Sequence, residues 1–189
     1  SVVRDGAVRN QRTLRNPIGC VGTGLHTGAK VSLTLHPAEP DSGVRFVRYD
    51  RPGGSTIPAR FDQVCATAMC SALGDAGGRA VGSVEHLMAA LAICEIDNVL
   101  VEASGPELPS MDGSAQPFVF LIECAGIVEQ ARPRRRIEVL KPVSVAAHGK
   151  YARLEPASGL ILDCEVHLEH PLVASQAMWT RSGFRCPVP

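Results

Sequence analysis

Gly82-Ser83-Val84-Glu85-His86-Leu87-Met88-Ala89-Ala90-Leu91 places an acid directly beside a histidine at the start of an apolar segment. Apolar residues recur there at helical spacing, which predicts a helix whose buried face consists of Val84, Leu87, Ala90 and Leu91. Ser83 is a suitable N-cap, because its hydroxyl can accept a hydrogen bond from a backbone N–H two or three residues on. Glu85 falls in the first turn, where the helix dipole favours a carboxylate.

The Glu85-His86 pair is the feature of this helix that suggests chemistry. Adjacent residues lie about 100° apart around a helix, so both side chains can point into one cleft. A carboxylate beside an imidazole on a rigid element suits a general base next to a metal ligand. The plainer interpretation, which we favour for the pair taken alone, is a capped helix end with a surface Glu-His pair.

The composition is that of a globular protein of 189 residues, long enough for one domain, or for one complete domain and part of another. Nineteen basic residues balance nineteen acidic ones, which argues against a nucleic-acid or anionic-membrane partner. We interpret the one concentrated basic run, Arg132–Arg136, as a solvated linker. No transmembrane segment is predicted, because no stretch approaches the ~18 apolar residues that one requires.

The seven cysteines indicate neither a disulfide framework nor a thiolate zinc site, because their number is odd and no C-x-x-C pair occurs. Free cysteines fit a reducing compartment best, so we expect a cytoplasmic protein.

The order of elements predicts an α+β domain with two layers, a mostly antiparallel sheet and two helices on one face. We expect strands over residues 11–18, 19–25 and 30–36, a returning strand over 44–49, and a central strand over 97–102. The second helix should run from Phe118 to Ala125, capped by Ser114 and ended by Gly126.

The chain then begins a weak repeat of the same order, in which paired strands are followed by a glycine-led strand, a Ser-Gly turn and another strand. We therefore expect a flexible N-terminus over 1–10, a complete domain over 11–131, a linker over 132–136, and an incomplete second α+β domain over 137–189. Strands that pair around Lys141-Pro142 should open the second copy. Its exposed strand edges predict self-association.

Four motifs together carry a specific resemblance. They are Gly22-Thr-Gly-Leu-His-Thr-Gly28, Ser83-Val-Glu-His-Leu87, Ile96-Asp-Asn98 and Pro106-Glu-Leu-Pro-Ser-Met-Asp-Gly-Ser114. In this order they resemble the bacterial UDP-3-O-acyl-N-acetylglucosamine deacetylase, a zinc hydrolase of lipid A synthesis, from about Gln11 to about Pro171. The resemblance implies two similar α+β domains packed face to face, with the active site between them.

The resemblance also implies roles for individual residues. Glu85 would be the general base and His86 a zinc ligand, while His26 would form a polar wall of the site. Met69 and Cys70 would lie where the substrate, UDP-3-O-acyl-N-acetylglucosamine, approaches with its acyl chain. Bound Zn²⁺ would activate a water for attack on the acetamide carbonyl.

One part of the family pattern is missing from this sequence. A catalytic zinc site usually has three protein ligands, and the family takes two of them from a histidine and an aspartate four residues apart. No His-x-x-x-Asp occurs here. We therefore expect a C-terminally truncated chain that carries one zinc ligand of three, lacks the general acid, binds zinc weakly and does not deacetylate alone. Two alternatives remain: a catalytically silent scaffold or regulatory relative, and a non-enzymatic sugar-nucleotide-binding module.

Overall fold

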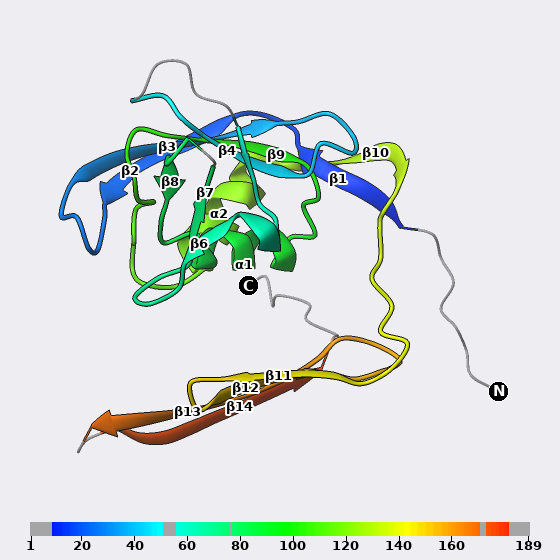
Figure 1. Ribbon diagram of the computed structural model, residues 1–189. Helices are drawn as coiled ribbons and strands as arrows, with labels where there is room; N and C mark the ends of the chain where they lie inside the picture. The colour runs from blue at the N-terminus through cyan, green and yellow to red at the C-terminus, as the bar shows by residue number, and fades with distance from the viewer. Residues whose placement is uncertain (1–8, 51–55, 76, 171–172, 182–189) are drawn as a thin grey trace. The chain divides into compact units, whose positions relative to one another are not determined.

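The computed structural model describes residues 9–50, 56–75, 77–170 and 173–181 (Figure 1). The chain divides into two compact units, Ser1–Arg135 and Arg136–Pro189. Most of the expected flexible N-terminus, residues 1–8, lies outside the described residues, and Asn10 already begins the first strand. Among the helices described, none is long and apolar enough to cross a membrane.

A five-stranded sheet in the order β2-β3-β9-β4-β5 forms one layer of the first unit. Its strands are β2 (Ile18–Thr23), β3 (Lys30–Pro37), β4 (Val44–Arg48), β5 (Ile57–Pro58) and β9 (Val99–Ala103). β3 is antiparallel to β2 and to β9, whereas β4 runs parallel to β9.

The central position of β9 was predicted correctly, but the predicted pairing of its neighbours was wrong. Residues 44–49 do not return beside 30–36, because β9 lies between β3 and β4. Val99, Val101 and Ala103 are fully buried. An apolar strand buries the most surface at the centre of a sheet. For this reason β9 pairs with β3, although β4 is nearer to β3 in sequence.

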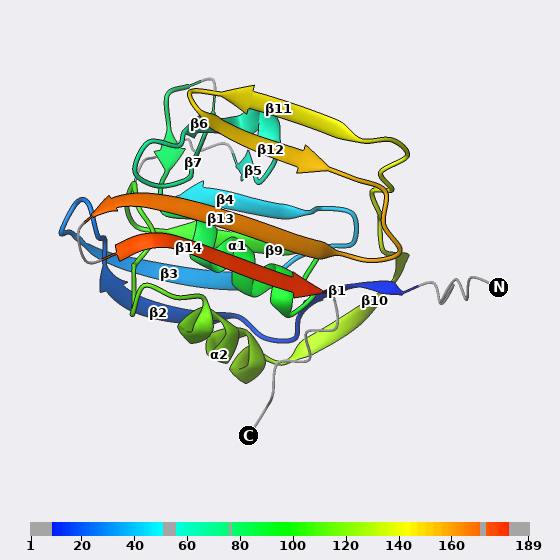
Figure 2. The same ribbon diagram turned by 90° about the horizontal axis from the view of Figure 1, so that it is seen from below.

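Both helices, α1 (Glu85–Ile93) and α2 (Gln116–Ala125), cover the same face of this sheet, as predicted (Figure 1). α1 lies over the centre of the sheet and α2 along its β2 edge (Figure 2). The four residues predicted for the buried face of α1 are all buried: Val84, Leu87, Ala90 and Leu91. The predicted α+β class is therefore confirmed.

The two helix starts differ from the predicted caps. Ser83 has φ +56° and its hydroxyl donates to Glu107 at 3.0 Å, so Val84 occupies the cap position without a side-chain bond. A carboxylate is a strong acceptor, which explains why this hydroxyl acts as a donor to it. Ser114 lies one residue before the cap of α2 and accepts from the Gln116 N–H at 3.1 Å. Gly126, with φ +74°, ends α2 as predicted.

Two smaller sheets complete the first unit. β1 (Asn10–Leu14) pairs antiparallel with β10 (Ile127–Pro133), and β6 (Val64–Ala66), β7 (Ala72–Gly74) and β8 (Ala80–Val81) form a three-stranded sheet after a 3₁₀ turn at Phe61–Gln63. The first two residues of the expected linker, 132 and 133, therefore belong to β10.

Asn98 lies just before β9 and is 1% exposed, and its side chain connects the β1–β10 sheet to the large sheet. Its amide nitrogen donates to Gln11 Oε1 at 2.8 Å and to Gln130 Oε1 at 2.7 Å. Its Oδ1 accepts from the Gly43 N–H at 2.8 Å. One side chain thus joins β1, β10 and the turn before β4.

The second unit contains two antiparallel hairpins, β11 (Val143–Ala147) with β12 (Lys150–Leu154) and β13 (Ile161–His170) with β14 (Val173–Arg181). The predicted pairing around Lys141-Pro142 is wrong, because β11 pairs forward with β12 across the turn at His148-Gly149. That turn supplies two consecutive residues with positive φ, as a tight hairpin requires. The expected self-association stays a prediction.

Candidate functional site

Glu85 is the first residue of α1, and its carboxylate is held by the backbone of a neighbouring segment. The Ser71 N–H donates to Glu85 Oε2 at 3.0 Å, and the Val84 N–H donates to the Ser71 carbonyl at 3.3 Å. Ser71 thus donates to the first turn of α1 through its N–H and accepts a hydrogen bond from the start of the helix through its carbonyl. The orientation of the carboxylate is therefore set by main-chain geometry.

Met69 and Cys70 directly precede this contact, so the structure brings them to the start of α1. The Cys70 sulfur lies 3.4 Å from the position that a Cβ on Gly82 would occupy. Met69 is 80% exposed, which leaves a large apolar side chain free to meet a ligand. Their expected contact with the substrate stays a prediction.

An apolar cavity of about 230 Å³ adjoins Glu85 on the first unit. Its wall includes Phe61, Val64, Leu73 and Met88, with Glu85 and Ser71 among its few polar members. A carboxylate at the edge of an apolar cavity is typical of a site that binds a ligand with both polar and apolar parts.

His26 lies in the exposed turn between β2 and β3, and its main chain is joined to the Pro106–Ser114 loop. The His26 N–H donates to Glu107 Oε1 at 3.0 Å, and the Thr27 N–H donates to Glu107 Oε2 at 2.9 Å. The same carboxylate accepts from Ser83. The His26 turn and the start of α1 therefore share one buried anion.

His86 is half-buried on α1, one residue beyond Glu85. The pKa of Asp112 is lowered chiefly by hydrogen bonds from the Ser114 hydroxyl and N–H, and the charge of His86 contributes a smaller lowering. His86 thus lies within electrostatic reach of the Pro106–Ser114 loop.

The pKa of Glu107 makes the stability of the fold depend on pH. Burial alone would raise the pKa of this carboxyl, but the bonds from His26, Thr27 and Ser83 outweigh burial and lower the pKa from 4.5 to about 2. A lowered folded-state pKa stabilises the fold fully above the unfolded value and loses that contribution as pH falls through the folded value.

We therefore expect the free energy of unfolding to decrease between about pH 4.5 and about pH 2. Urea unfolding at half-unit pH steps measures this decrease. In Glu107→Gln the part of the decrease that Glu107 causes should be absent. If the stability of this variant falls with pH as steeply as that of the parent, other carboxylates cause the decrease.

His86, the one residue expected to bind zinc, is not part of a complete metal site in the described part of the chain. No group of three or more His, Cys, Asp or Glu that could hold a metal ion occurs among the described residues. His86 is one imidazole, and a catalytic zinc site has three protein ligands. The expected role of His86 as a zinc ligand stays a prediction.

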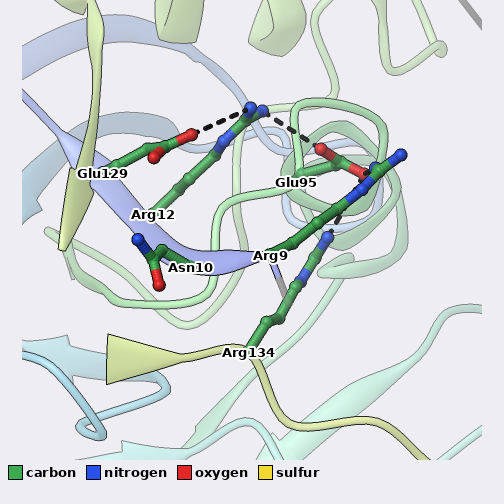
Figure 3. Close-up of a pocket in the computed structure, with 6 residues that line it drawn as sticks. All are labelled: Arg9, Asn10, Arg12, Glu95, Glu129 and Arg134. Atoms are coloured by element: carbon green, nitrogen blue, oxygen red, sulfur yellow. Dashed lines mark hydrogen bonds and ion pairs between the residues drawn. The ribbon is translucent and has the colours of Figure 1, made fainter. Parts of the chain in front are cut away.

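A separate charged cavity of about 270 Å³ lies at the other end of α1 (Figure 3). Glu95, which follows the helix with φ +57°, forms ion pairs with Arg9 at 2.6 Å, Arg12 at 3.1 Å and Arg134 at 3.4 Å. Arg134 also pairs with Asp97 at 2.8 Å.

The basic run was expected to be a solvated linker, and for Arg134 this is wrong. Its guanidinium pairs with Glu95 and Asp97 in the segment that follows α1, and the pairing of β10 with β1 brings Arg134 to them. Each of the three arginines that line the cavity has a carboxylate partner, so their charges are already engaged within the protein.

Two residues of the Glu85 region were not identified as site residues from sequence. Ser71 acts through its backbone, so nothing in its residue type indicates the contact. Glu107 belongs to the Pro106–Ser114 motif, but its residue type alone gives no sign that its donors come from the His26 turn and from Ser83.

Comparison with known proteins agrees with these motifs. The chain matches the family of UDP-3-O-acyl N-acetylglycosamine deacetylases over residues 11–185. It belongs to this family. Of the relatives named UDP-3-O-acyl-N-acetylglucosamine deacetylase, that of Myxococcus xanthus is 48% identical over 176 residues, covering 93% of this chain and 56% of the relative.

Two further deacetylases are similar to this family member. That of Shewanella halifaxensis is 43% identical over 164 residues, covering 87% of this chain and 54% of the relative. That of Shewanella violacea is 42% identical over 174 residues, covering 92% and 57%. The chain thus spans about half the length of the curated relatives that it matches.

Proposed function

We propose that this chain supplies the general base and one metal ligand of a deacetylase that removes acetate from UDP-3-O-acyl-N-acetylglucosamine in lipid A synthesis. The observation that carries the proposal is the Glu85 carboxylate, held by the Ser71 N–H beside His86 at the start of α1. Membership of the deacetylase family and the names of the relatives support the substrate.

Glu85 would act as the base. Its Oε2 accepts from Ser71, and no other hydrogen bond to its side chain occurs among the described residues, which leaves Oε1 to accept a proton from a water molecule. The backbone bond keeps the carboxylate in one orientation without neutralising it. General base catalysis needs this combination of fixed position and available lone pair.

We assign one zinc ligand, His86, to this chain. Zinc, when bound, supplies a Lewis acid that lowers the pKa of a bound water and stabilises developing negative charge. The described residues do not complete such a site. We assign contacts with the substrate to His26, Met69 and Cys70, and the reaction to the cytoplasm.

The test measures binding and turnover on the same protein. Chain labelled with ¹⁵N is titrated with UDP-3-O-acyl-N-acetylglucosamine in the presence of zinc, and acetate release is followed in parallel. We expect amide shifts at residues 69–71 and 84–86, weak zinc binding, and no acetate release above background. His86→Ala should weaken zinc binding, whereas His148→Ala, in the β11–β12 turn, is the matched control and should not.

Each departure has a definite meaning. Robust turnover would contradict the assignment of a single zinc ligand. Substrate binding that zinc and His86→Ala leave unchanged would favour a non-enzymatic sugar-nucleotide-binding module. The absence of shifts at residues 69–71 and 84–86 would contradict the location of the site.

A further inference from the structure

Glu107 is a buried carboxylate, 3% exposed, that accepts hydrogen bonds from two separate parts of the chain. Its Oε1 accepts from the His26 N–H and the Ser83 hydroxyl, both at 3.0 Å, and its Oε2 accepts from the Thr27 N–H at 2.9 Å. Charge-assisted bonds of this kind are stronger than neutral ones. This carboxylate thus joins the His26 turn to the residues that precede α1.

The main chain on either side of Glu107 is also fixed by hydrogen bonds, both of them to Gly82. The Gly82 N–H donates to the Pro106 carbonyl at 2.8 Å, and the Leu108 N–H donates to the Gly82 carbonyl at 3.0 Å. A Cβ added to Gly24 would lie 2.5 Å from Glu107 Oε2. A side chain at residue 24 would therefore force this carboxylate and the Thr27 hydroxyl to shift.

Ser83 shows that this arrangement imposes a conformational cost. Its φ of +56° lies in the left-handed region, which residues with a side chain disfavour. Such a conformation persists where the surroundings over-determine it, and it is common near functional groups. The Ser83–Glu107 hydrogen bond forms in this conformation, two residues before Glu85.

We propose that Glu107 is a positioning residue, which fixes the His26 turn relative to Glu85 and His86 at the start of α1. Glu107 would touch neither substrate nor metal. The importance of this positioning for catalysis rests on the proposed function, because only that function requires His26, Glu85 and His86 to face one ligand. The positioning itself can be measured independently of any activity.

A role in general stability would give a different result from positioning. Loss of stability alone lowers the protection of all slowly exchanging amides together, whereas loss of a local anchor exposes only the amides that it held. The amides of His26 and Thr27 report the anchor, and those of Leu33 and Val101 in the sheet report global unfolding.

The first experiment compares Glu107→Gln with Asp112→Asn by amide hydrogen exchange. Asp112 is a matched control, since it is an exposed carboxylate of the same loop that accepts only from Ser114 in the described contacts. We expect Glu107→Gln to lower the protection of His26 and Thr27 by about tenfold or more beyond any change at Leu33 and Val101, and to shift the amides of Glu85 and His86. Asp112→Asn should leave His26 and Thr27 protection as it is.

Ser83→Ala is a second variant in case Glu107→Gln does not fold. It removes one donor and keeps the two backbone bonds, so His26 should remain protected while the amides of Val84, Glu85 and His86 shift. Unchanged amides at Glu85 and His86 in every folded variant, or protection lost uniformly across the sheet, would overturn the proposal.

A substrate titration separates this inference from the proposed function. If the proposed function and the positioning role are both correct, the substrate shifts the amides of His26 and Glu85 together in the parent chain. Glu107→Gln should then bind the substrate about tenfold more weakly. If the parent binds no substrate, the proposed function fails and the exchange experiment still decides the role of Glu107. If the parent binds and Glu107→Gln binds equally well, the positioning role is overturned.

Discussion

Replacing Asn98 with alanine is expected to lower the free energy of unfolding by about 3–5 kcal/mol, because three hydrogen bonds, one buried and two part-buried, lose their shared partner at once. The Gly43 N–H and the Gln130 Oε1 would each lose the bond that Asn98 makes to them. Gln11 Oε1 keeps the Asp41 N–H at 2.9 Å and is affected less. A buried polar group left without a partner costs about 1–3 kcal/mol.

Asn10→Ala is the matched control, since Asn10 is exposed in β1 and makes no side-chain hydrogen bond among the described contacts. Urea unfolding followed by circular dichroism gives both values, and an unchanged m-value confirms that the unfolding reaction is the same. A loss below about 1 kcal/mol for Asn98→Ala would mean that water replaces the lost amide. In that case Asn98 would not be the connection between β1, β10 and the turn before β4.

Replacing Phe118 with alanine is expected to cost about 3–5 kcal/mol, the range for removing a large aromatic side chain from a packed core. Phe118 is 1% exposed in the first turn of α2, the helix that packs against α1. The loss combines the transfer of the ring to water with the cavity that remains. Because α2 supports α1, the start of α1 should become more mobile in the same variant.

Phe120→Ala is a control with the same change in chemistry, two residues along the same helix. Its side chain is 62% exposed, so we expect a loss below about 1 kcal/mol. Chemical denaturation of the two variants side by side gives the difference directly. Equal losses would show that intrinsic helix stability, and not burial against α1, dominates at these positions.

Local pattern predicted much of the first unit. The apolar spacing of residues 84–91 gave the buried face of α1, and Gly126 gave the end of α2. Both predictions succeeded because each depends on residues within one or two turns of a helix. The run of apolar residues before Ala103 likewise predicted a central strand, since an apolar composition favours a position between other strands.

The predictions that failed depend on partners far apart in sequence. The strand on the side of β3 away from β2 is β9, about 65 residues further on, and not β4. Ser83 donates to Glu107 and does not cap α1. Arg134 pairs with Glu95 and Asp97 and does not stay solvated. In each case an electrostatic or apolar gain from a distant segment exceeds a local preference of about 1 kcal/mol.

The candidate site shows the same division. The sequence by itself determined which residue types could do the chemistry, since Glu85-His86 and three companion motifs suffice to place the chain in the deacetylase family. Only the tertiary structure decided how they are held: the Glu85 carboxylate by the Ser71 backbone, and the His26 turn by Glu107. The physical reason is that residue type specifies what a group can donate or accept, whereas its partner depends on which segments the buried core brings within hydrogen-bonding distance.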